Sequence, residues 1–289
     1  MINPRNALLA ALLSLILVAG CSGAGNAPTP AKPAGDAKPA AQSGRFIVAG
    51  SGTNLPITGK LADAYNKKPG AAAVEVPKSI GTDGAVKAVQ AGTLELGLAS
   101  RPLTAAEKAS GLVEIPYARV AIIFAAHPGV SDTDVTPDDI VNIHRGTKNA
   151  WRDGRPIIVL IRGMHDSSNL TLFQLIPGYA DAIKDSIDQK RWQIMYHDID
   201  MAEALRTKQG AFGHTDSTEI KINAGIKPLS VGGVAPTDGN ITSGRYPYVK
   251  PLSFIHKGPL SERAKAFLAF VASREGRTVI TDNGGTPLQ

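Results

Sequence analysis

Apolar runs that suit buried strands alternate along this chain with segments in which apolar side chains recur at helical spacing. The clearest case is residues 157–175, where a β-branched apolar run is followed by short polar residues and then by a helical pattern. The run predicts a strand buried on both faces, and the pattern after it predicts a helix. The same alternation along the rest of the chain predicts an α/β fold.

The pattern predicts the following elements from residue 45 onward. Apolar runs predict strands at 45–50, 72–76, 94–98, 117–126, 157–161, 194–197, 228–234 and 251–256. Helical spacing predicts helices that start near 55, 84 and 167, and helices at 138–144, 180–189, 202–205 and 262–271. On the last helix, Ala266, Phe267 and Phe270 are expected to face inward. Polar, turn-rich residues predict loops at 146–154 and 237–244.

Polar side chains follow the ends of several predicted strands, directly before a predicted helix. These residues are Thr53, Thr82, Ser100 with Arg101, and Arg162 with Ser167. In open α/β sheets ligands bind outside the carboxyl ends of the strands. A helix start offers free N–H groups at a positive dipole end, which suits an anion. The pattern therefore predicts an anion site, although Thr53 and Thr82 could also serve as helix caps.

Arg162 is the strongest single candidate for ligand contact. Its planar guanidinium offers paired donors that match a tetrahedral oxyanion, and it stands just before a polar helix start. The alternative is an arginine held in a surface salt bridge. For Arg101, ligand contact and a plain Arg-Pro turn are equally good interpretations. His165 is expected at the rim of the site.

The amino terminus predicts export and a lipid anchor. Residues 1–20 combine Arg5 with an apolar run and small residues, as in a signal peptide, and Cys21 follows a stretch that resembles a lipobox. Residues 21–44 hold no large apolar side chain, so we expect a disordered linker after the lipidated cysteine. Cys21 is the only cysteine, which excludes an intrachain disulfide.

Charge and motifs argue against several function classes. Removing residues 1–20 lowers the formal charge from +6 to +5, which is too little and too scattered to indicate nucleic acid. The six histidines show no metal-ligand spacing, so no metal or other cofactor is expected. Gly-x-Ser-x-Gly is absent, the lysine of a P-loop is absent, and a catalytic role is not expected.

Several blocks of the sequence resemble, in order, segments of PstS-like phosphate-binding proteins, the extracytoplasmic receptors of phosphate ABC transporters. The blocks read Ala-Gly-Ser-Gly-Thr-Asn-Leu-Pro at 49–56, Ile-Gly-Thr-Asp-Gly-Ala-Val-Lys at 80–87, Ser-Arg-Pro-Leu at 100–103 and Trp-Arg-Asp-Gly at 151–154. The segments 245–252 and 264–276 resemble the closing strand and helix of that family. The resemblance covers almost all of residues 45–289.

The resemblance implies a two-lobe periplasmic-binding-protein-like (type II) fold with a two-strand hinge. Lobe 1 would hold 45–126 and 248–289, and lobe 2 would hold 127–247. It implies a monomeric, lipid-anchored receptor in the bacterial cell envelope that passes inorganic phosphate to ABC transporter permease subunits. On the family pattern Thr53, Asn54, Leu55, Thr82, Arg162, Ser167, Ser168 and Asn169 would hold the ligand, and Ser100, Arg101 and Asp166 are added as candidates from this chain's own residues.

Two departures from the family pattern concern the choice of ligand. Where the well-known phosphate receptors carry an aspartate that accepts the ligand's proton, this chain has Arg101. The usual Arg-x-x-x-Ser-Gly-Thr is shifted by one residue, so that Asp166 precedes Ser167. Asp166 is the candidate acceptor, and a helix cap is its alternative role. Molybdate, tungstate or sulfate, a sensor without a transporter, and a secreted phosphoester hydrolase are the rival functions.

Overall fold

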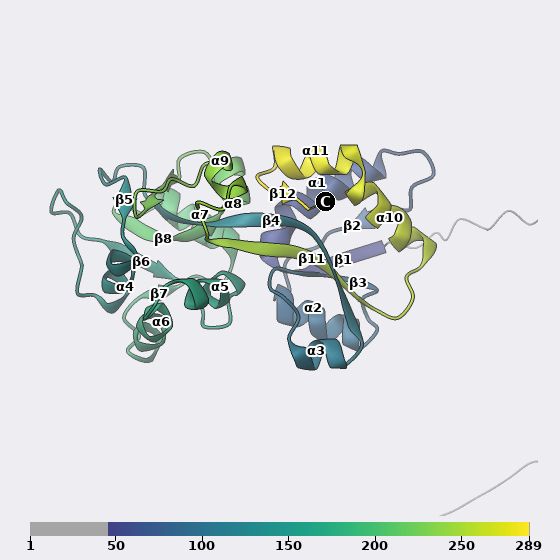
Figure 1. Cartoon of the computed structure of the whole chain (residues 1–289), viewed down its shortest axis with the longest axis horizontal. Helices are drawn as coiled ribbons and strands as arrows, with labels where there is room; N and C mark the ends of the chain where they lie inside the picture. Colours follow the sequence, from purple (N-terminus) through teal and green to yellow (C-terminus); the bar gives the residue numbers. More distant parts are fainter. Residues whose placement is uncertain (1–45, 289) are drawn as a thin grey trace, which may run out of the picture. The chain divides into compact units, whose positions relative to one another are not determined.

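Two long strands, β4 (Leu112–Ala126) and β11 (Val249–Lys257), pair antiparallel and connect two lobes that each carry helices on both faces of a sheet (Figure 1). The computed structural model describes residues 46–288, which belong to one compact unit. The predicted signal peptide, Cys21 and the predicted linker lie outside the described residues. Within residues 46–288, no helix has the length and apolar character needed to cross a membrane.

Lobe 1 is built on three parallel strands next to β11. In this sheet β1 lies between β2 and β3, and β3 pairs antiparallel with β11. One core packs α1, α10 and α11 on one face, and a second packs α2 on the other. The elements are β1 (Phe46–Gly50), η1 (Gly52–Asn54), α1 (Leu55–Asn66), β2 (Val74–Glu75), α2 (Gly81–Gln90), β3 (Leu96–Ala99), α3 (Ala105–Ala109), α10 (Glu262–Ala272), α11 (Arg274–Asp282) and β12 (Thr286–Pro287).

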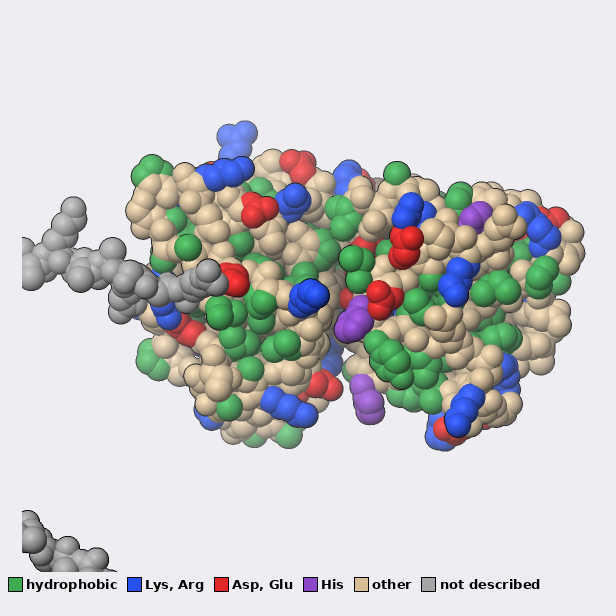
Figure 2. Space-filling view, turned by 180° about the vertical axis from the view of Figure 1, so that it is seen from behind, with side chains coloured by type: hydrophobic (Ala, Val, Ile, Leu, Met, Phe, Trp, Pro, Cys, Tyr) green, Lys and Arg blue, Asp and Glu red, His purple; other side chains and the backbone are tan. Residues whose placement is uncertain are grey.

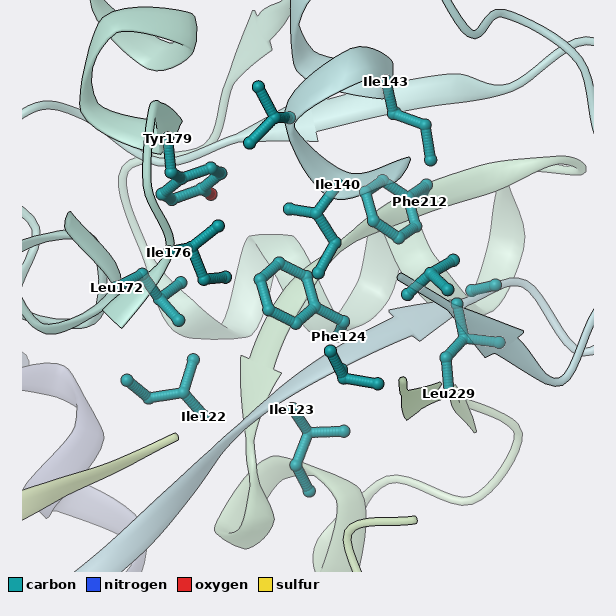
Figure 3. Close-up of a cluster of buried hydrophobic side chains, with 14 of the residues drawn as sticks. Ile122, Ile123, Phe124, Ile140, Ile143, Leu172, Ile176, Tyr179, Phe212 and Leu229 are labelled. Atoms are coloured by element: carbon teal, nitrogen blue, oxygen red, sulfur yellow. The ribbon is translucent and has the colours of Figure 1, made fainter. Parts of the chain in front are cut away.

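Lobe 2 continues the sheet from the second half of β4. There β8 pairs antiparallel with β4, and β6 runs parallel to β8 and to β7. Phe124, Ile140, Tyr179 and Phe212 meet in its larger core (Figure 3). The elements are β5 (Asp134–Val135), α4 (Pro137–Arg145), β6 (Ile158–Ile161), α5 (Ser167–Leu175), α6 (Tyr179–Asp188), β7 (Gln193–Ile194), α7 (Asp198–Thr207), β8 (Ala211–Asp216), α8 (Ser217–Ile222), β9 (Lys227–Pro228), β10 (Ser230–Val231) and α9 (Asp238–Thr242).

The α/β prediction is confirmed, and most predicted elements are present. Residues 157–175 form strand β6 and helix α5 as expected. Strand β8 was missed, because its sequence Ala-Phe-Gly-His-Thr-Asp is mostly small or polar even though all six residues are buried. The predicted loop at 237–244 contains the short helix α9, and the predicted strand at 194–197 ends at Ile194. Ala266 is exposed, so its predicted inward orientation was wrong.

Candidate functional site

A cavity of about 1040 Å³ lies between the two lobes, outside the carboxyl ends of their strands. Lobe 1 contributes the turn around η1 and the start of α2, and lobe 2 contributes the loop after β6, the start of α7 and part of α8. The space-filling view shows a groove between the lobes with histidine, acidic and hydrophobic side chains beside it (Figure 2). The predicted position of the site at strand ends therefore matches a cavity in the structure.

Hydroxyl groups from both lobes meet at the inner end of this cavity. Ser51, just after β1, shares a hydrogen bond with Ser100, just after β3, with 2.6 Å between their Oγ atoms. Ser100 Oγ donates to Ser167 Oγ across the lobes at 2.7 Å, and its backbone N–H donates to Thr82 Oγ1 at 3.3 Å. These groups form a continuous hydroxyl network, and a hydroxyl can both donate to a ligand and accept from a cation.

Lys250 on β11 brings a buried positive charge to this hydroxyl network. Its side chain is 1% exposed, and its Nζ donates to Thr53 Oγ1 at 2.8 Å and to Ser168 Oγ at 2.6 Å. Ser167 Oγ lies 3.4 Å from the same nitrogen. Within the described chain, no carboxylate forms a salt bridge with Lys250. A buried cation held only by neutral groups favours an anion nearby.

Sequence reasoning missed Lys250. The one available signal was a lysine within the apolar return strand, where a charged side chain is rarely buried without a role. Its importance depends on the pairing of β11 with β4, which places residue 250 at the hinge between the lobes.

Arg162 lines the cavity from the end of β6 and is 6% exposed. Its Nε and Nη2 donate to Asp166 Oδ2 at 3.0 and 2.8 Å, and Nη2 lies 3.4 Å from Asp198 Oδ1. Burial opposes the charge of Arg162, but the carboxylates of Asp166 and Asp198 outweigh it and raise the pKa. Among residues 46–288, no partner reaches Nη1 of this guanidinium.

Asp166 and Asn169 hold Arg162 in place. Asp166 is the N-cap of α5, and its Oδ1 accepts from the backbone N–H groups of Ser168 and Asn169. Burial alone would raise the pKa of Asp166, yet Arg162 and Lys250 lower it well below its usual range. Asn169 donates through Nδ2 to the carbonyl oxygens of Arg162 and Gly163 at 3.0 Å. Helix α5 thus fixes the strand end that presents the arginine.

Beside Asp83 and Asp200, two further carboxyl groups that line the cavity are those of Asp198 and Glu219, and sequence reasoning did not identify either of these two. Asp198 begins α7, and its Oδ2 lies so close to Gly52 that a side chain at residue 52 would collide with it. Burial raises the pKa of Asp198 despite the nearby Arg162. Burial, together with the charges of Asp216 and Asp198, raises the pKa of Glu219 on α8 to about 7. Both groups therefore bind protons more readily than ordinary carboxyls.

The Glu219→Gln variant should change how stability depends on pH. Folding raises the pKa of Glu219 from its ordinary value of 4.5 to about 7, so the folded state keeps a proton that the unfolded state releases first. The free energy of unfolding should therefore fall as pH rises through this window, and this contribution should vanish in Glu219→Gln. Urea unfolding of both proteins at a series of pH values measures the difference. An identical pH profile for the two proteins would contradict this assignment.

The remaining predicted ligand residues occupy different positions. Asn54 is fully buried and donates to the Ala99 carbonyl oxygen while it accepts from the Tyr117 hydroxyl, so its side chain joins β3 to β4. Leu55 and Thr82 line the cavity. Arg101 also lines it, but its guanidinium is paired with Glu107 at 2.7 Å and Asp83 at 2.8 Å.

No group of three or more His, Cys, Asp or Glu side chains within residues 46–288 is arranged to hold a metal ion. The cavity is lined by the buried guanidinium of Arg162 and by hydroxyl groups from both lobes, of which Thr53 and Ser167 also contact the buried Lys250. This set of donors is suited to an oxyanion.

Comparisons with known proteins agree with the fold and with the resemblance. The sequence profile of the PBP superfamily domain matches residues 35–275. Phosphate-binding protein PstS of Bacillus subtilis is 23% identical over 295 residues, covering 98% of this chain and 95% of that protein. Phosphate-binding protein PstS 2 of Streptococcus agalactiae is 27% identical over 111 residues, and that match spans only 38% of each chain.

A solved structure supports the architecture. A Clostridium perfringens substrate-binding protein with bound phosphate superposes with a TM-score of 0.77 and is 22% identical in sequence, over 85% of this chain and 100% of the other. At this identity the likeness establishes the fold and not the ligand.

Proposed function

This chain belongs to the PBP superfamily, and from that premise we propose that it is a receptor that captures inorganic phosphate between its two lobes for an ABC transporter. The observation that carries the proposal is the pair of buried cations at the cavity. Arg162 has a guanidinium nitrogen without a partner within residues 46–288, and Lys250 is bonded to hydroxyl groups. A multiply charged oxyanion would satisfy both.

Donor groups from both lobes would couple anion binding to closure of the lobes. Thr53 and Ser100 belong to lobe 1, whereas Arg162 and Ser167 belong to lobe 2. An anion held from both sides favours the closed arrangement, because only that arrangement makes both sets of contacts. Lys250, on the strand that joins the lobes, stabilises the anion in either arrangement.

The export and anchoring part of the proposal rests on the amino-terminal sequence. Residues 1–20 would direct export, Cys21 would carry the lipid, and 21–44 would link the lipid to the folded lobes at the cell envelope. The lobe bounds 45–126 with 248–289, and 127–247, also stay predictions.

A thermal-shift screen over oxyanions tests the proposed ligand. A ligand that binds only the folded state raises the melting temperature, and the shift grows with the logarithm of the ratio of ligand concentration to dissociation constant. We expect phosphate to give a larger shift than sulfate, molybdate or tungstate at equal concentration. A larger shift with any of the other three would reassign the receptor to that anion.

Selectivity for phosphate over sulfate is expected to depend on a carboxyl that accepts the ligand's proton. Asp166 is the sequence-based candidate, but both of its oxygen atoms already accept hydrogen bonds within the protein. Asp198 is a second candidate, since it lines the cavity beside Arg162. We expect Asp198→Asn to narrow the ratio of phosphate to sulfate affinity by about tenfold.

Calorimetric titration of both anions into Asp198→Asn and Asp166→Asn separates the two carboxyls. In Asp166→Asn, the amide oxygen can still cap α5, but Arg162 loses its charged partner, which should weaken both anions together and leave their ratio unchanged. A narrowed ratio in Asp166→Asn alone would instead assign the acceptor role to Asp166.

A further inference from the structure

The proposed anion-binding groups, Thr53, Arg162 and Ser167, make up only part of the lining of the cavity. The cavity measures about 1040 Å³, at the upper end of the roughly 300–1,000 Å³ typical of sites for drug-sized organic ligands. A phosphate ion has only a handful of atoms, and in the proposed site Thr53, Arg162 and Ser167 would supply its donors. Much of the cavity therefore lies beyond the reach of a phosphate held there.

Apolar side chains from both lobes also line the cavity, beside charged ones such as Lys78 and Asp200. Three of them are strongly exposed: Tyr196 at 73%, Ile199 at 71% and Ile222 at 50%. The others are Leu55, Pro56, Met164 and Met195. Hydrophobic side chains beside the groove are visible in Figure 2. An exposed apolar cluster is uncommon on a soluble protein and marks a surface that binds something.

The polar and apolar parts belong to one continuous cavity. Met164 follows Arg162 by two residues in the loop after β6, and Ile199 follows Asp198 at the start of α7. A single ligand that enters the cavity would therefore meet the charged end and the apolar side chains together. Free phosphate has no apolar surface to offer to these side chains.

We propose that the cavity also takes monosubstituted phosphoryl compounds, that is, phosphomonoesters or phosphonates that carry an apolar organic group. The proposal rests on the proposed oxyanion site, which would hold the phosphoryl oxygens. The organic group would lie against Tyr196, Ile199 and Ile222 and remove their apolar surface from water. Met164, which is half-buried, would adapt its shape to the bound group, because an unbranched thioether side chain is flexible.

Phenylphosphonate and methylphosphonate are suitable probes, because the carbon–phosphorus bond prevents release of free phosphate. In calorimetric titration of the wild-type protein, phenylphosphonate should bind at least about tenfold more tightly than methylphosphonate. In the double variant Tyr196→Ala, Ile199→Ser, the ratio of phenylphosphonate affinity to methylphosphonate affinity should fall towards one, while the affinity for phosphate stays unchanged. Ile47→Ser changes an exposed isoleucine on β1 that does not line the cavity, and it should leave the ratio intact.

The phosphate titration distinguishes failure of this proposal from failure of the proposed function. If phosphate binds but the wild-type protein does not distinguish the two phosphonates, the organic subsite is refuted and the phosphate site stands. If the double variant weakens phosphate and both phosphonates equally, the apolar residues serve lobe closure and the subsite is again refuted. If none of the three anions binds, both proposals fail.

Discussion

The Arg162→Ala variant is expected to lose at least about 100-fold in affinity for phosphate. Hydrogen bonds that involve a charged group contribute about 1.5–3 kcal/mol each, and this arginine is the buried cation that lines the cavity directly. Calorimetric titration of phosphate into the wild-type and variant proteins measures the loss. Affinity within about threefold of the wild type would remove Arg162 from the ligand site.

Two companion variants make the Arg162 result interpretable. Arg162→Ala leaves Asp166 and Asp198 without their cation, which costs about 3–5 kcal/mol of stability and could unfold part of the protein. Arg162→Lys keeps the charge but loses the planar pair of donors, so it should fold and still bind phosphate more weakly than the wild type. Arg101→Ala removes a cavity arginine that is already paired with Glu107, and it should leave phosphate affinity nearly unchanged.

The Lys250→Met variant is expected to weaken phosphate binding by about 30-fold. Lys250 donates hydrogen bonds to Thr53 and Ser168, whose neighbours line the cavity. A positive charge close to a bound anion contributes about 2 kcal/mol to binding in a partly solvated site. The free energy of unfolding of the ligand-free protein should fall by less than the binding free energy, because methionine fills the space without a buried charge. Calorimetric titration and urea unfolding of the same variant measure both quantities.

Lys257→Met is the matched control for Lys250→Met. Lys257 ends the same strand, β11, but its side chain is exposed, whereas that of Lys250 is buried against Thr53 and Ser168. Lys257→Met should change neither the affinity for phosphate nor the free energy of unfolding appreciably. Equal weakening by the two variants would mean that the net charge of the protein, rather than the position of Lys250, governs phosphate affinity.

The sequence was sufficient to predict the parts of the site that depend on local pattern. Arg162 and the start of α5 could be predicted because a buried strand, an arginine and a run of helix-capping residues follow one another within a short stretch. Thr53, Thr82 and Ser100 could be predicted in the same way, because each follows a predicted strand. In the structure, Ser100 contacts Ser167 directly, and Thr53 contacts Ser167 through Lys250.

The parts that depend on pairing between distant segments were not predictable. Lys250 reaches Thr53 and Ser168 because β11 pairs with β4 at the hinge, and Asp198 reaches Gly52 only when the two lobes face each other. Strand β8 lies in the centre of lobe 2 with a small and polar sequence, so its neighbours in the sheet, and not its own pattern, define it. Asn54 was predicted as a ligand residue, and its hydrogen bonds join β3 to Tyr117.

Calorimetric titration of phosphate into protein freed of bound phosphate by unfolding and refolding tests the central claim most directly. The claim is that one oxyanion is held between the lobes by Arg162 above the charge of Lys250. We predict saturable binding of one phosphate per chain that is weakened in both Arg162→Lys and Lys250→Met. Absence of saturable binding, or binding that neither substitution affects, would contradict the claim.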